Sequence, residues 1–81
     1  MREELYKQIL ELTNECEKRD NITYDISICI DNIPMCLFDI EKVKYSSGVL
    51  RFYINNRIVF GFCVAVIKDS FKWSFLQLEN N

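Results

Sequence analysis

The chain has 81 residues, of which 49% are hydrophobic and 27% are charged, and its formal net charge is −2. A sequence of this length corresponds to one domain with a small core, and two glycines and one proline exclude linkers and low-complexity segments. The absence of histidine excludes Ser–His and Cys–His nucleophile pairs and His-containing metal sites.

Residues 2–18 are predicted to form a helix. Leu5, Ile9, Leu12 and Cys16 recur at steps of four, three and four, which is the spacing of one apolar stripe on an α-helix. The positions between them are mostly charged or polar. We therefore expect one amphipathic helix that buries a single face.

Five strands are predicted in the remainder of the chain. In the clearest of them, isoleucine or tyrosine alternates with smaller or polar residues, which is the period-two pattern of a strand with one buried face. Turn-forming Asn, Asp, Pro, Ser and Gly residues separate it from four further segments. The predicted strands span residues 22–30, 35–45, 49–54, 57–68 and 71–78.

Short connections make neighbouring strands pair in sequence order. The expected fold is therefore α+β, a single domain over residues 1–81 in which the N-terminal helix packs on a curved five-stranded antiparallel meander sheet. Around Pro34 the apolar spacing favours an odd-length loop, which would bring Phe38 onto the buried face. Asn55–Asn56 fits a tight two-residue hairpin turn.

The predicted strand 57–68 is apolar on both faces. One helix is about 10 Å across, whereas five strands make a sheet about 20 Å wide, so the helix can cover only part of one face. We expect the helix to approach at Gly61, Cys63 and Ala65, where small side chains leave room. Either the sheet curls closed over its other face, or a second copy or a partner protein covers that face. Large side chains expected there include Ile58, Phe60, Phe62, Trp73 and Phe75.

The residues that could carry chemistry do not form a catalytic pattern. None of the four cysteines belongs to a CxxC pair, and we expect reduced thiols and no metal or cofactor. Asp25 and Asp31 would lie about 20 Å apart along one strand, too far for an acid–base pair, so we expect a protein that is not an enzyme. The charged N-terminus and the lack of a long apolar run predict a soluble, cytoplasmic protein that does not enter the membrane.

Charge is unevenly distributed, since residues 1–41 sum to −6 and residues 42–81 to +4. In the second part, basic residues are interleaved with aromatic ones, a pattern that can follow phosphates and stack on bases. Nucleic-acid-binding domains are usually basic overall, which this chain is not. A nucleic-acid-binding module that uses the third to fifth strands is therefore an alternative function, and a homodimeric adaptor or structural subunit is another.

The best interpretation is a non-enzymatic protein-binding module, because aromatic side chains on an uncovered face are typical of protein interfaces. Exposed acidic residues would present negative charge to a basic partner. The candidate partner-binding residues are Phe60, Phe62, Trp73, Phe75, Tyr53, Arg51, Asp25, Asp31, Asp39 and Glu41.

In size and composition, short and rich in Ile, Asn, Lys and aromatic residues, the chain resembles small soluble proteins encoded by phages and mobile elements, among them anti-CRISPR and other counter-defence inhibitors. This resemblance implies an inhibitor that docks on a larger host protein of nucleic-acid handling or defence and blocks it sterically.

Overall fold

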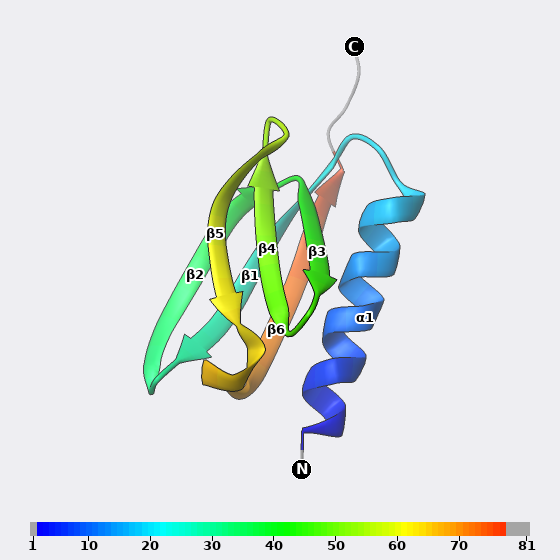
Figure 1. Ribbon diagram of the computed structural model, residues 1–81. Helices are drawn as coiled ribbons and strands as arrows, with labels where there is room; N and C mark the ends of the chain where they lie inside the picture. Colours follow the sequence, from blue (N-terminus) through cyan, green and yellow to red (C-terminus); the bar gives the residue numbers. More distant parts are fainter. Residues whose placement is uncertain (1, 78–81) are drawn as a thin grey trace.

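The computed structural model of the chain describes residues 2–77. Its elements are α1 (Glu3–Lys18), β1 (Ile22–Ile30), β2 (Ile33–Ile40), β3 (Lys42–Ser46), β4 (Val49–Ile54), β5 (Arg57–Cys63), the 3₁₀ turn η1 (Val64–Val66) and β6 (Ile67–Gln77). The strands form two antiparallel sheets, ordered β2-β1-β6 and β3-β4-β5 (Figure 1). The predicted α+β class is confirmed, whereas the single five-stranded meander is wrong.

The helix α1 buries the predicted apolar stripe of Leu5, Ile9, Leu12 and Cys16. It does not lie across the middle of one sheet. It packs along β3 of one sheet and β6 of the other, so it closes the side of the molecule on which these two edge strands lie (Figure 1). Full burial of an aliphatic side chain contributes about 1.5–3 kcal/mol, so this stripe is a large part of the folding energy.

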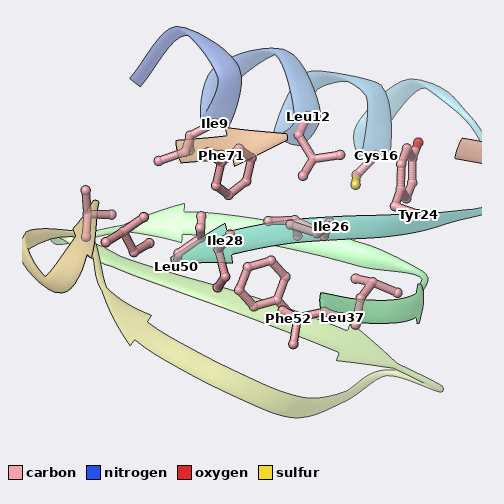
Figure 2. Packing of buried hydrophobic residues seen from close by; sticks show 14 of the residues in the cluster. Ile9, Leu12, Cys16, Tyr24, Ile26, Ile28, Leu37, Leu50, Phe52 and Phe71 are labelled. Carbon is pink, nitrogen blue, oxygen red and sulfur yellow. The ribbon is translucent and has the colours of Figure 1, made fainter. Parts of the chain in front are cut away.

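The hydrophobic core lies between the two sheets and the helix (Figure 2). In β1 the predicted alternation is confirmed, because Tyr24, Ile26 and Ile28 are buried while Asp25 and Ser27 between them are exposed. The core cluster consists of Leu5, Ile9, Leu12, Cys16, Ile22, Tyr24, Ile26, Ile28, Leu37, Ile40, Val43, Leu50, Phe52, Val64, Ile67 and Phe71.

The hairpin between β1 and β2 has a two-residue turn. Asp31 and Asn32 both have positive φ, 49° and 67°, as a tight turn of this kind requires. Ile26 therefore pairs with Leu37, and the next residue, Phe38, points outward. The predicted odd-length loop is wrong because both turn residues are of the types that tolerate the left-handed conformation, which leaves Pro34 free to lie within β2.

The predicted strand 35–45 is divided between the two sheets. A β-bulge in β2 contains Asp39, whose φ is 59°. The chain leaves the first sheet after Ile40 and enters the second at Lys42. Bulges bend strands, and strands that switch between packed sheets commonly use them. The apolar side chains on either side of this corner, Ile40 and Val43, are both buried in the core.

A second bulge, in β5, decides which side chains of that strand face the core. Next to the hairpin turn, Tyr53 pairs with Ile58, but the following pair is Phe52 with Phe60, so Val59 is the extra residue. Opposite residues of an antiparallel pair point to the same face, and one extra residue therefore reverses the orientation of those that follow.

As a result, Phe60 and Phe62 share the inner face with Phe52, and Gly61 points outward. The predicted arrangement, with Gly61 against the helix and both phenylalanines on the far face, is wrong. A Cβ added to Gly61 would meet no atom within 4 Å, so the helix does not approach there. The predicted hairpin turn at Asn55–Asn56 is confirmed by φ values of 52° and 62°.

The apolar run after β5 is interrupted where a continuous strand was predicted. Val64–Val66 form η1, and β6 then starts at Ile67 and runs through residues 69–70, where a turn was expected. Val64 is buried, and its N–H donates to a backbone carbonyl of the β3–β4 turn at 2.9 Å. Residue 78, at the end of the last predicted strand, lies outside the described residues.

We expect Gly61→Ala to leave the free energy of unfolding unchanged or to raise it by up to about 1 kcal/mol, because open space surrounds this position and alanine restricts the unfolded chain. Gly48→Ala is the matched contrast. Gly48 has a φ of +75° in the β3–β4 turn, so alanine there should lower the free energy of unfolding by about 1 kcal/mol. Urea unfolding of both variants measures the difference, and equal destabilisation would contradict the outward placement of Gly61.

Candidate protein-binding surface on β5

The four aromatic residues predicted to form one partner-binding face lie in two different sheets. Phe60 and Phe62 belong to β5, whereas Trp73 and Phe75 belong to β6. The structure therefore does not bring these four side chains together on one face of a single sheet. The surroundings of each pair decide what it can contribute.

Trp73 is part of the packing around the core. It lies opposite Ile26 on the inner face of its sheet, and its ring meets Tyr24 edge-on, with ring centroids 5.9 Å apart. Phe75, two residues further along the same strand, is 55% exposed. Of this pair, Phe75 is the more exposed, whereas Trp73 is partly buried and packs against the core.

The strand β5 carries three consecutive large apolar side chains that are exposed. Its first five residues are all exposed, with exposed fractions of 56% for Ile58, 41% for Val59 and 39% for Phe60. Phe62 packs edge-on against Phe52 with centroids 6.1 Å apart, and Phe60 stacks on Phe62 at 6.2 Å. One ring is thus held against the core, and the next extends the same stack toward solvent.

β5 is also the end of its sheet, since it pairs with β4 and with no other described strand. An unpaired edge presents backbone N–H and C=O groups to which another strand can add. The other edge strands carry features that hinder addition. These are Pro34 in β2, and exposed lysines together with the flanking helix beside β3 and β6. Both β2 and β5 contain a bulge, so a bulge does not distinguish these two edges. The single charged residue of β5 is Arg57, at its first position.

The predicted acidic residues lie in turns, corners or beside bulges, where they have local structural roles. Asp25 accepts a hydrogen bond from the backbone N–H of Asp39 at 3.2 Å, which holds the bulge of β2. Glu41 accepts one from the first backbone N–H of the β4–β5 turn at 2.9 Å, which ties the corner between the sheets to that turn. Asp31 occupies the β1–β2 turn, and its N–H donates to the carbonyl oxygen of Val66 at 3.3 Å.

Arg51 and Tyr53 lie on the outer face of β4. Arg51 is directly opposite Lys44 of β3, and Tyr53 is opposite Lys42. The ammonium of Lys44 lies 5.3 Å from the centre of the Tyr53 ring, and Arg51 donates to the hydroxyl of Ser46 at 3.3 Å. Like charges directly opposite each other weaken a strand pair, so an anion bound on this outer face would be stabilising.

Within residues 2–77, two titratable side chains, Cys16 and Tyr24, are buried in the interior and lie beside each other (Figure 2). Burial raises the pKa of Tyr24 to about 12 and also raises the pKa of the Cys16 thiol. Both groups stay neutral near pH 7, which favours packing over a nucleophilic role. The described residues contain no group of three or more His, Cys, Asp or Glu side chains that could hold a metal ion.

Comparison with protein-family models, curated proteins and solved structures gave no match for this chain. No helix within residues 2–77 is long and apolar enough to span a membrane. The candidate surface therefore rests on the geometry of β5.

The sequence-based candidates on β5 included Phe60 and Phe62 but not Ile58 or Val59. One sequence feature could have identified Ile58 and Val59 as exposed: the strand that contains them is apolar on both faces. One narrow helix cannot cover both faces and the free edge of such a strand, so some of its apolar side chains must be exposed.

We expect Tyr24→Phe to keep or raise the free energy of unfolding near pH 7, because the buried Tyr24 hydroxyl has no nitrogen or oxygen hydrogen-bond partner and only the Cys16 thiol, a weak one, beside it. In the wild type, the folded pKa of Tyr24 lies above the unfolded value of about 10, so its contribution is complete below pH 10 and is lost as the pH rises toward 12. Urea unfolding between pH 10 and pH 12 should show that the free energy of unfolding falls less in Tyr24→Phe than in the wild type. Identical pH profiles for the two proteins would contradict the assignment.

Proposed function

We propose that the chain is a non-enzymatic protein-binding module whose binding element is the free edge of β5. The observation that supports this proposal is the combination, in one strand, of an unpaired edge, exposed Ile58, Val59 and Phe60, and no charge beyond its first residue. Soluble proteins normally protect such edges with charged residues or proline, and an edge that has neither after its first position is suited to pairing with another chain.

A partner segment in extended conformation would add to β5 as a further strand of the sheet. Backbone hydrogen bonds would supply affinity, and pockets for alternate side chains would supply selectivity. Phe60 is suited to anchor the partner because its ring already stacks on Phe62, so little side-chain freedom is lost on binding.

The most concrete form of the proposal is a cytoplasmic inhibitor that docks on a larger host protein and blocks it sterically. Three features support it: the small size of the chain, its resemblance in composition to phage-encoded inhibitors such as anti-CRISPR proteins, and a binding element that needs no catalytic group. The partner class is a host protein of nucleic-acid handling or defence.

Peptides selected from a random library for binding to the wild-type protein test this proposal. We expect them to slow amide hydrogen exchange in β5 and to bind at least roughly tenfold more weakly to Phe60→Lys, because a charge on an edge strand opposes strand addition. Phe38→Lys is the matched control, since Phe38 is 62% exposed in the other sheet and should not affect affinity. Melting temperatures of both variants report whether the fold is retained.

Two results would contradict the β5 edge as the binding element. One is protection from exchange that maps outside β5. The other is an equal loss of affinity in the Phe60→Lys and Phe38→Lys variants.

A second candidate function, nucleic acid binding, is supported by the outer face of β3 and β4. Lys44 and Arg51 lie opposite each other there, beside the ring of Tyr53. Phosphate groups would relieve the repulsion between the two cations, and the ring could stack on a base. This face differs from the β5 edge, so the two functions can be tested separately.

Titration with labelled single-stranded and duplex DNA at two salt concentrations tests the second candidate. We expect Arg51→Gln to weaken binding severalfold and to reduce its salt dependence, because one phosphate contact is lost. Lys68→Gln, in the other sheet, is the control of equal charge change. Absence of binding at the lower salt concentration would eliminate this candidate.

A further inference from the structure

We propose that, when no other protein is bound, the free edge of β5 pairs with β5 of a second copy of this chain in antiparallel orientation. This inference rests on the proposed role of the β5 edge in binding and names one occupant for it. Pairing about a two-fold axis would join the two β3-β4-β5 sheets into one continuous sheet with the order β3-β4-β5-β5-β4-β3.

The charge distribution of β5 favours pairing with itself in the antiparallel orientation. Its seven residues carry a single charge, on Arg57 at the first position. In an antiparallel pair, Arg57 lies next to the Cys63 end of the second copy. In a parallel pair, the two Arg57 side chains would be neighbours and would repel each other.

An acidic residue lies near the Cys63 end of β5. η1 follows Cys63 directly, and Val66 in η1 accepts a hydrogen bond from the N–H of Asp31 at 3.3 Å. Val66 is one 3₁₀ turn from Cys63, about 6 Å along the axis, so the exposed Asp31 is close to this end of the strand. In the antiparallel pair, Arg57 of each copy would approach Asp31 of the other, and the two-fold axis repeats this attraction.

The surroundings of β5 leave a second copy free to approach. The helix α1 lies on the opposite side of the molecule, along β3 and β6 (Figure 1). A strand of this length extends about 20 Å, so strand pairing together with Ile58 and Phe60 makes a small interface. Interfaces below about 1,200 Å² are mostly weak or transient. We therefore expect a micromolar dimer that a tighter-binding partner can displace.

Sedimentation equilibrium of the untagged wild-type protein, from about 1 µM to about 1 mM, tests this proposal. We expect a monomer–dimer equilibrium and expect Ile58→Lys to raise the Kd of the dimer at least roughly tenfold. Leu10→Lys on α1 is the matched control, because Leu10 is 55% exposed and Ile58 is 56% exposed. A wild-type protein that is monomeric at every concentration, or equal effects of the two substitutions, would overturn the proposal.

Arg57→Gln tests the orientation without altering the apolar surface. If the pair is antiparallel, the dimer of Arg57→Gln should be severalfold weaker than the wild-type dimer at low salt. Asp31→Asn should weaken the dimer to the same extent. Asparagine is chosen because it tolerates the positive φ of the turn. A tighter dimer in Arg57→Gln would show that the two Arg57 side chains are neighbours, and would overturn the antiparallel arrangement.

The outcomes for the second copy and for the proposed function can be distinguished. A protein that stays monomeric but binds the selected peptides at β5 overturns the pairing of two copies and retains the binding role of the edge. If the protein dimerises through β5 but binds no extended peptide, the pairing of two copies is supported. The proposed binding of other proteins at β5 is then overturned.

Discussion

Side chains along a strand alternate between two faces, so each extra residue in a strand reverses the orientation of everything beyond it. In this molecule, two such residues determine which apolar side chains reach the core. The bulge at Asp39 keeps both Leu37 and Ile40 on the inner face of β2 and directs the chain toward the second sheet. The bulge at Val59 turns Phe62 inward beside the residues of β4. Core formation across two sheets depends on these two local irregularities.

The helix is too narrow to cover a whole sheet, and its position does not require it to do so. Because the inner faces of the two sheets cover each other, the helix has to close only the side between β3 and β6 (Figure 1). The opposite side of the molecule contains β2 and β5. Pro34 hinders strand addition to β2, whereas β5 has exposed apolar side chains, no proline and no charge after Arg57. The binding role proposed for β5 follows from this asymmetry.

Elements with long, uninterrupted periodicity could be predicted from the sequence. The helix and the strands at 22–30 and 49–54 have the expected positions because one apolar face runs through each of them without a break. The division of 35–45 could not be predicted, since the apolar pattern continues through a bulge that carries no glycine or proline. The break at Val64–Val66 is likewise made of apolar residues that resemble a strand.

Only part of the candidate site could be predicted, because face and sheet assignments depend on bulges and strand pairing that the sequence pattern does not show. Aromatic composition identified Phe60 and Phe62, which do lie on the exposed edge strand. Their grouping with Trp73 and Phe75 depended on pairing between β5 and β6, which belong to different sheets because β6 pairs with β1. The acidic candidates were chosen for charge, whereas the hydrogen bonds of Asp25 and Glu41 to distant backbone groups depend on the corner between the sheets.

The pairing of the first strand with the last has a consequence for how the molecule is made. β1 hydrogen-bonds to β6, with Ile26 opposite Trp73, so most of the chain lies in the loop that this pairing closes. Contacts between residues so far apart in sequence form late, after local hairpins. During synthesis on the ribosome, α1 and β1 would keep their apolar faces uncovered until β6 emerges, so the first sheet can be completed only after all the elements between β1 and β6 have been made.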